Sequence, residues 1–273
     1  MPELPEVETV RRSLERLVVG KTIRDVDVFV EKMIRNMDET KLKEILSNQA
    51  IVKIDRRGKY LMFDIGDYYI VSHLRMEGRY FIKHLDEPKD KHEHVIFYFK
   101  DGQTMRYHDT RKFGTFDIVK KNEIDQFKPL VSLGFEPLDE RLTVQYLKEK
   151  LSHKTIAIKS ALLDQHIVAG LGNIYVNEVL FLSKIHPEKP SYTLKKKELE
   201  QIVKYSKEVL ELAIKDGGTT IRSYTSSLGV TGRFQQHLKV HMQDRCPVCG
   251  KDIQKIKVGG RGTYLCDNCQ KMS

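Results

Sequence analysis

The sequence has few of the features that mark exported, membrane-spanning or disulfide-stabilised proteins. Its 273 residues contain no apolar run approaching the roughly 18–20 residues of a membrane-spanning helix. The acidic, proline-containing start, MPELPE, lacks the basic and apolar regions of a signal peptide. Only 4 cysteines are present, all of them after residue 245. We therefore expect a soluble cytoplasmic protein with no membrane association and no disulfide framework.

Acidic residues are outnumbered by basic ones, 38 to 47, and the imbalance lies mostly in the second half of the chain. After Leu133 there are 22 basic and 15 acidic residues, so this part carries seven of the nine excess positive charges. Such a distribution favours a polyanionic partner, either nucleic acid or an acidic membrane surface. No basic amphipathic helix supports the membrane alternative.

The hydrophobic pattern predicts an α+β protein of several domains. Apolar residues at three- and four-residue steps predict a helix over 7–18, ended by Gly20. From Thr22 to about Val119, short β-branched and aromatic runs separated by turns predict a β-sandwich or barrel. Further helices are expected at 39–47, 143–151, 157–164, 174–182 and 195–215, with a mobile loop at 217–233. The expected domain bounds are 1–133, 134–238 and 239–273.

The cysteines form two CxxC pairs, Cys246/Cys249 and Cys266/Cys269, separated by sixteen residues. Two such turns joined by a hairpin place four thiolates at the corners of a tetrahedron, which is the geometry that zinc prefers. The alternative is a set of reduced thiols or a redox pair. Because four protein ligands leave no open position, the expected single zinc ion is structural. Nearby lysines and Arg261 could contact phosphate or simply cover a solvated surface.

The segment GLGNIY, residues 170–175, lies between two predicted helices. Its glycines permit tight turns, and Asn173 could cap the helix that follows. The free N–H groups at that helix start could meet an anion such as a DNA phosphate. A plain helix–helix corner is an equally good interpretation of the same residues.

The chain start has its own chemistry. Because residue 2 is small, we expect removal of Met1, which would leave Pro2 with a terminal secondary amine. An α-amino group has a pKa of roughly 8, so part of it is neutral and nucleophilic near neutrality. Attack on a sugar C1′ would give an iminium, and the adjacent Glu3 could move protons at the same centre. Alternatively, both are ordinary leader residues.

Three blocks taken together resemble the formamidopyrimidine-DNA glycosylase family. They are the MPELPEVET leader, the GLGNIY segment and the paired CxxC motif preceded by Arg261-Gly262-Thr263, and they occur in the family's order. The resemblance implies an N-terminal β-sandwich with flanking helices, a helix–two-turn–helix domain and a C-terminal zinc-finger β-hairpin. It implies excision of oxidised purines (8-oxoguanine and formamidopyrimidines) and strand cutting by β,δ-elimination. The implied partner is duplex DNA with oxidised bases or abasic sites, bound by a monomer.

The resemblance also implies site residues. Pro2 is matched to the nucleophile, Glu3 to the acid/base and Glu6 to a supporting position. Lys59, in the RRGKYL block, is matched to proton transfer in β-elimination, and Arg261 to the δ step and phosphate binding.

The implied DNA contacts form two sets. The phosphate-contacting positions correspond to His92, Arg111, Lys154 and Asn173. Met76, Arg111 and Phe113 correspond to the residues that fill the gap left by an extruded nucleotide. On their own, Met76 and Phe113 would be interpreted as strand core and His92 as a surface histidine. The 217–233 loop is matched to the loop that caps the lesion.

Two alternatives stay open. The sister endonuclease VIII type acts on oxidised pyrimidines, although Leu4 matches the purine-type leader. A zinc-finger protein that only binds DNA would explain the cysteines and the basic charge but not Pro2, Glu3 and Lys59. One departure from the family pattern is Leu265, where an aromatic residue commonly precedes the third cysteine.

Overall fold

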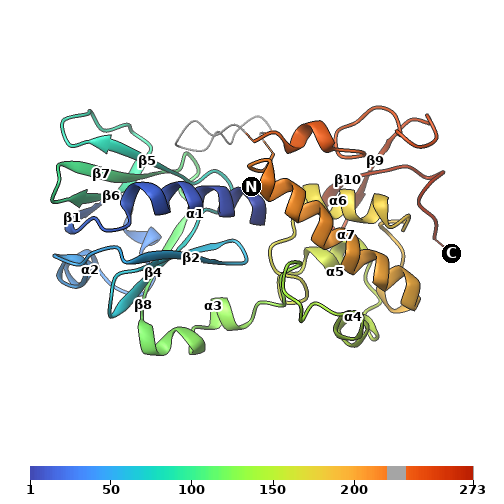
Figure 1. Cartoon of the computed structure of the whole chain (residues 1–273), viewed down its shortest axis with the longest axis horizontal. Helices are drawn as coiled ribbons and strands as arrows, with labels where there is room; N and C mark the ends of the chain where they lie inside the picture. Colours follow the sequence, from blue (N-terminus) through green and yellow to red (C-terminus); the bar gives the residue numbers. More distant parts are fainter. Residues whose placement is uncertain (220–231, 273) are drawn as a thin grey trace. The chain divides into compact units, whose positions relative to one another are not determined.

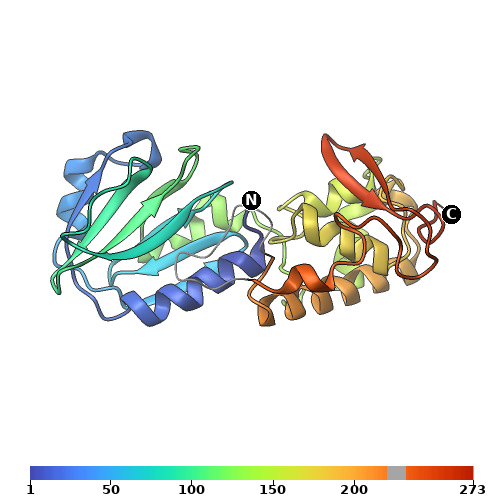
Figure 2. The same ribbon diagram turned by 90° about the horizontal axis from the view of Figure 1, so that it is seen from above.

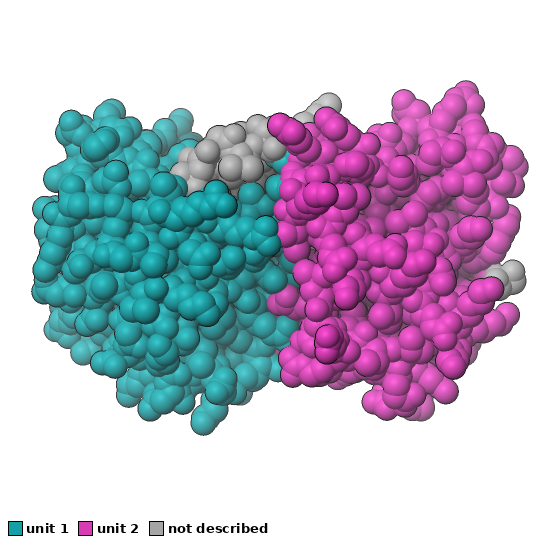
Figure 3. All heavy atoms as spheres, viewed as in Figure 1, with its two compact units in different colours: residues 1–131, 217–232 teal, residues 132–216, 233–273 magenta. Residues whose placement is uncertain are grey.

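The computed structural model describes residues 1–219 and 232–272. Figure 3 shows its two compact units, residues 1–131 with 217–232 (unit 1) and residues 132–216 with 233–273 (unit 2). Most of the predicted 217–233 loop, residues 220–231, lies outside the described residues. Within the described ranges no helix is both long and apolar enough to cross a membrane.

Unit 1 is built on two four-stranded antiparallel sheets (Figure 1). One sheet has the order β1-β6-β7-β5 and the other β2-β3-β4-β8. The strands are β1 (Ile23–Val28), β2 (Lys53–Arg57), β3 (Tyr60–Asp64), β4 (Tyr68–His73), β5 (Arg79–His84), β6 (Glu93–Phe99), β7 (Gln103–His108) and β8 (Thr115–Lys120). Edge-on ring contacts join the two sheets, Tyr80 to Phe63 at 5.7 Å and Tyr107 to Phe116 at 5.0 Å between centroids. These buried aromatics form the core of the predicted β-sandwich.

Helices flank this sandwich. Helix α1 (Leu4–Val18) packs against β2 and β3, and Figure 2 shows it lying along the strands of unit 1. Pro5 suits its first turn, and the apolar stripe ending at Val18 is buried. Gly20, with φ of +85°, then takes the left-handed conformation that ends the helix. The remaining elements are η1 (Glu31–Met33), α2 (Glu39–Leu46), η2 (Lys121–Gln126) and α3 (Lys128–Val131).

Unit 2 combines a helical layer with one β-hairpin. Its elements are α4 (Val144–Leu151), α5 (Ile158–Leu163), α6 (Asn173–Leu182), η3 (Ser191–Thr193), α7 (Lys196–Lys215), η4 (Phe234–His237), β9 (Gln254–Val258) and β10 (Arg261–Leu265). Helix α6 is buried on nearly all sides and packs against α5, α7 and β10. The predicted helices and the predicted fold class are confirmed.

Candidate active site

The start of the chain is buried apart from Met1, which is 46% exposed. Pro2 and Glu3 are buried, and Glu3 is the residue that precedes α1. The backbone N–H of Glu3 donates to Glu6 Oε2 at 2.8 Å. Because this bond closes the first turn of the helix, it fixes the backbone beside Pro2.

Glu6 uses its second oxygen to hold the chain segment that precedes residue 220. The backbone N–H of Thr219 donates to Glu6 Oε1 at 2.8 Å, and the Thr219 hydroxyl donates to the same oxygen at 3.2 Å. Gly218, at φ +80°, passes so close that a Cβ there would lie 2.6 Å from that oxygen. Only glycine fits both the conformation and the space. Glu6 therefore ties the chain start to the beginning of the predicted lesion-capping loop.

A second chain of contacts connects α1 to the turn that carries Lys59. Glu8 on α1 pairs with Arg56 on β2 (Oε2 to Nε, 3.2 Å), and Arg56 Nη1 donates to the Gly58 carbonyl at 2.8 Å. Gly58 and Lys59 form the two-residue turn between β2 and β3, where Gly58 has φ of +57°. Glycine first is the pattern of a type II′ hairpin. Lys59 is only 5% exposed.

His73, which sequence reasoning missed, lies beside this turn. Its ring meets Tyr60 edge-on at 4.6 Å, and its Nδ1 accepts a hydrogen bond from the Arg75 amide at 2.9 Å. Burial, followed by the charges of Arg75, Lys59 and Arg35, lowers the pKa of His73 to about 3. The ring is therefore neutral at physiological pH and carries its proton on Nε2.

The low pKa of His73 predicts a pH-dependent stability. As pH falls below the ordinary value of 6.5, the unfolded chain takes up a proton at His73 that the folded protein takes up only near pH 3. The free energy of unfolding should therefore fall by about 2 kcal/mol from pH 7.5 to pH 5 because of this one ring. Urea unfolding followed by circular dichroism should show a shallower decline in His73→Asn by that amount. The same substitution at exposed His153 should leave the decline unchanged, and equal declines in all three proteins would contradict the assignment.

Arg111 and Phe113 lie together in the loop between β7 and β8. Neither is strand core: Phe113 is 49% exposed, and the Arg111 guanidinium stacks 4.8 Å from its ring centroid. Asp109, fully buried, organises this loop. Its carboxylate accepts the backbone N–H groups of Arg111, Phe113 and Gly114 at 2.8–2.9 Å. Aspartate often accepts a backbone N–H two residues further along in a turn, so the sequence is compatible with this role of Asp109. The same pattern occurs in many turns and does not single out Asp109.

The turn that carries Met76 lies beside the Asp109 loop. Met76 is half-buried in the turn between β4 and β5, so it too is not strand core. A Cβ on Gly78 would lie 2.0 Å from the Tyr107 hydroxyl oxygen, and a Cβ on Gly114 would lie 1.7 Å from it. The backbones of both turns therefore pack directly against the Tyr107 hydroxyl. The Thr110 hydroxyl also hydrogen-bonds Glu77 across the two turns. The structure thus brings the three predicted gap-filling residues onto adjacent turns.

His92, predicted to contact phosphate, is half-buried among other histidines. Its ring lies 5.4 Å from that of His108 and 6.4 Å from that of His94. The His92 carbonyl accepts from the Asp109 amide at 3.0 Å. The same aspartate therefore fixes the backbone at His92 and the loop with Arg111 and Phe113.

In unit 2 the GLGNIY segment folds as a corner, but Asn173 does not cap the helix. The residue before α6 is Gly172, and Asn173 is the first helical residue. Its side-chain Nδ2 instead donates to the Gly262 carbonyl at 3.0 Å, next to Arg261. The capping prediction was wrong because the backbone of Asn173 is already helical, so Gly172 occupies the cap position. Lys154 lies elsewhere in unit 2, before α5, where its carbonyl accepts from the Tyr192 amide.

The four cysteines converge at the base of the β9–β10 hairpin. All four sulfurs lie within 4.8 Å of one another, with Cys246 and Cys269 at 3.7 Å and Cys249 and Cys266 at 3.5 Å. Sulfurs at the corners of a Zn–S₄ tetrahedron are about 3.8 Å apart. The donor set thus fits one structural zinc ion, as predicted, with no position left for a reacting group.

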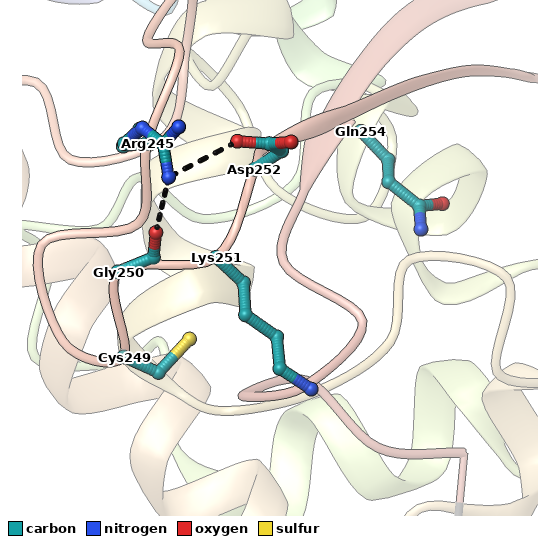
Figure 4. A pocket seen from close by; sticks show the side chains of 6 residues that line it. All are labelled: Arg245, Cys249, Gly250, Lys251, Asp252 and Gln254. Carbon is teal, nitrogen blue, oxygen red and sulfur yellow. Dashed lines mark hydrogen bonds and ion pairs between the residues drawn. The ribbon is translucent and has the colours of Figure 1, made fainter.

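Exposed polar contacts border the first CxxC turn. Figure 4 shows the first CxxC turn, where Arg245 reaches both the Gly250 carbonyl (3.2 Å) and Asp252 (3.5 Å). Leu265, the departure from the family pattern, is fully buried. The preceding Tyr264 packs edge-on against His241 at 4.9 Å, so an aromatic ring still contributes to this module.

Comparisons with known proteins match this architecture part by part. The N-terminal domain of formamidopyrimidine-DNA glycosylase matches residues 1–116, and its H2TH domain matches residues 133–225. A zinc finger found in this glycosylase and in isoleucyl-tRNA synthetase matches residues 243–271. Together with the buried chain start, these parts define a DNA glycosylase of the H2TH, zinc-finger type.

Full-length relatives narrow the class to one family. A formamidopyrimidine-DNA glycosylase of Bacillus cereus is 50% identical over 99% of both chains, and one of Oceanobacillus iheyensis is 48% identical over 99% of this chain and 98% of its own. A Lactococcus lactis Fpg bound to abasic-site DNA has a TM-score of 0.93 and 43% identity, covering 98% of this chain and 99% of its own. The chain belongs to the formamidopyrimidine-DNA glycosylase family, whose members are base-excision-repair enzymes that also cut abasic strands.

Proposed function

We propose that this protein excises oxidised purines from duplex DNA through an imine formed by Pro2 and then cuts the abasic strand by β,δ-elimination. The observation that carries the proposal is the buried chain start, where Glu6 anchors both the Glu3 amide and Thr219. The first residues of a domain are usually poorly ordered, whereas here Glu6 binds both the Glu3 amide and the Thr219 amide, which indicates that the position of the chain start matters for function. Removal of Met1 would expose the Pro2 nitrogen at this fixed position.

The first step is attack of the Pro2 nitrogen on C1′ of the deoxyribose. The bond from C1′ to the base breaks, and the base leaves with a proton. Glu3, buried beside Pro2, is the group that protonates O4′ as the sugar ring opens, which leaves an iminium at C1′. Glu6 accepts the Glu3 N–H and so holds the peptide group that links Pro2 to Glu3.

The later steps use the iminium as an electron sink. Loss of a proton from C2′ and breakage of the C3′–O3′ bond constitute β-elimination, for which Lys59 is the proposed proton carrier. Loss of a further proton and breakage of C5′–O5′ constitute the δ step, assigned to Arg261. Water then hydrolyses the imine and releases Pro2. The hairpin held through Arg56 keeps the buried Lys59 in a defined position for its part.

The loop between β7 and β8, which Asp109 holds, and the turn between β4 and β5 extrude the damaged nucleotide. Phe113 and Met76 provide apolar wedges, and Arg111 faces the orphaned base, so the gap in the duplex is filled. Phosphates are contacted by His92, Arg111, Lys154 and Asn173. The zinc held by the four cysteines supplies rigidity to the hairpin that carries Arg261. We place the protein in the bacterial cytoplasm, acting as a monomer on chromosomal DNA.

A lesion panel with borohydride trapping tests the proposal. Duplexes with 8-oxoguanine opposite cytosine should be cut to β,δ products and should yield a covalent protein–DNA adduct. Duplexes with thymine glycol should react at least about tenfold more slowly. Preference for the pyrimidine lesion would favour the endonuclease VIII type, and tight binding without an adduct would indicate a protein that only binds DNA.

A further inference from the structure

Lys159, in the middle of unit 2, is a fully buried lysine that the mechanism above does not use. It lies in α5 and is 0% exposed. Its Nζ donates to Thr263 Oγ1 at 2.6 Å, to Asn177 Oδ1 at 2.9 Å and to the Gly262 carbonyl at 3.1 Å. Burying an ammonium is costly, and an apolar side chain could fill the same space, so this lysine needs a reason beyond packing.

Two of the three acceptors lie directly beside Arg261. The Thr263 hydroxyl accepts from Lys159 and donates to the Arg261 carbonyl at 3.0 Å. The Gly262 carbonyl accepts from Lys159 and also from Asn173 Nδ2 at 3.0 Å. The peptide groups of Arg261 and of the following residue are thus both held through one ammonium.

The turn before Arg261 is held against the same helix. Gly259 and Gly260 have φ of +54° and +78°, as expected for a two-residue type I′ turn. A Cβ on Gly259 would lie 2.4 Å from Ser160 Oγ, next to Lys159 in α5. The hairpin tip therefore lies in close contact with α5, and Arg261 projects from a backbone fixed on both sides.

The third acceptor extends the network into α6. Asn177 accepts from Lys159 through Oδ1 and contacts His241 Nδ1 through Nδ2 at 2.7 Å. The His241 amide in turn donates to the buried Glu178 at 2.8 Å. Because α6 begins at Asn173, one network spans the GLGN corner, α5, residue 241 and the zinc-finger hairpin.

We infer that Lys159 is a positioning residue: it fixes the backbone at Arg261 relative to Asn173, so that Arg261 is correctly placed for the δ step. The inference rests on the proposed function, since it assumes that Arg261 serves δ-elimination. Lys159 itself touches no substrate, and its effect passes through the Thr263 hydroxyl and the Gly262 carbonyl. Loss of the ammonium should therefore change which product forms more than whether the imine forms.

Product partition on a preformed abasic site tests this inference. In single-turnover reactions, Lys159→Met should lower the ratio of β,δ product to β product by about tenfold or more. Borohydride trapping, which reports on Pro2, should change by less than about threefold. Thr263→Val should lower the ratio in the same direction because it also breaks the link, and Thr263→Ser should restore it. Exposed Lys207→Met controls for the loss of a lysine from unit 2.

Zinc content and melting temperature establish that each variant is folded. If Lys159→Met does not fold, the comparison of Thr263→Val with Thr263→Ser tests the inference instead. An unchanged product ratio in folded Lys159→Met or Thr263→Val would overturn the inference. A parallel fall in trapping and δ product would do so too, because it would indicate general damage. If the wild-type protein gave no trapped adduct, the proposed function would fail instead.

Discussion

Extension of the chain by even one residue ahead of Pro2 should abolish both base excision and borohydride trapping. The Pro2 nitrogen would then belong to an amide, which is not a nucleophile. We expect single-turnover excision of 8-oxoguanine to fall by about a thousandfold or more, as is typical when an attacking group is lost. Such extended protein can be made by placing Gly-Ser between Met1 and Pro2 and confirming its N-terminus by mass measurement.

DNA binding provides the control for this experiment. Because the proposed phosphate contacts and gap-filling loops lie outside the first residues, affinity for a duplex with an uncleavable abasic analogue should change little. The same two residues added at the C-terminus should leave excision intact. A trapped adduct formed at the wild-type rate by the extended protein would show that the nucleophile lies elsewhere.

Removal of zinc should weaken DNA binding and strand cutting together, each by about a hundredfold or more. The reason lies in the connectivity of the hairpin: Cys266 directly follows β10, and Arg261 begins that strand. Without the metal the cysteines no longer fix the base of the hairpin, so the backbone at Arg261 loses its support. Chelator-treated protein, with zinc loss verified by elemental analysis, should be compared by fluorescence anisotropy and by nicking.

Restored function on adding back zinc, but not calcium, would separate metal loss from irreversible damage. Cys266→Ser should reproduce the effect, because a hydroxyl is a poor zinc ligand. Full binding and cutting by verified metal-depleted protein would contradict a structural role for this ion.

A helix or strand could be predicted from the sequence wherever its apolar residues follow a clear helical or strand period. The 20-residue helix α7 and the α1 helix have strong apolar stripes, and both appear as predicted. Strand β7 was not among the apolar runs recognised in the sequence, because its buried residues include Arg106, which is paired with Glu93, and only Met105 and Tyr107 are apolar. The Arg106–Glu93 pair stabilises this strand through a residue on another strand, and no local sequence pattern indicates such a pair.

The candidate site divides in the same way. The leader and the paired CxxC motifs are continuous in the sequence and could be recognised directly. His73, Asp109 and Lys159 could not, because each acts through partners supplied by another segment or through the backbone of a turn. Asn173 illustrates the reverse error: local preference suggested a cap, but the helix begins one residue earlier than such a cap allows, and the Asn173 amide donates to the distant Gly262 carbonyl instead.

The most direct test of the account is the mass of the peptide that carries the trapped DNA. After reaction with an 8-oxoguanine duplex in borohydride and digestion of both polymers, the sugar remnant should lie on the peptide that begins at Pro2, attached to its nitrogen. A remnant on Lys59 or any other lysine, or on a peptide that still begins with Met1, would contradict the account.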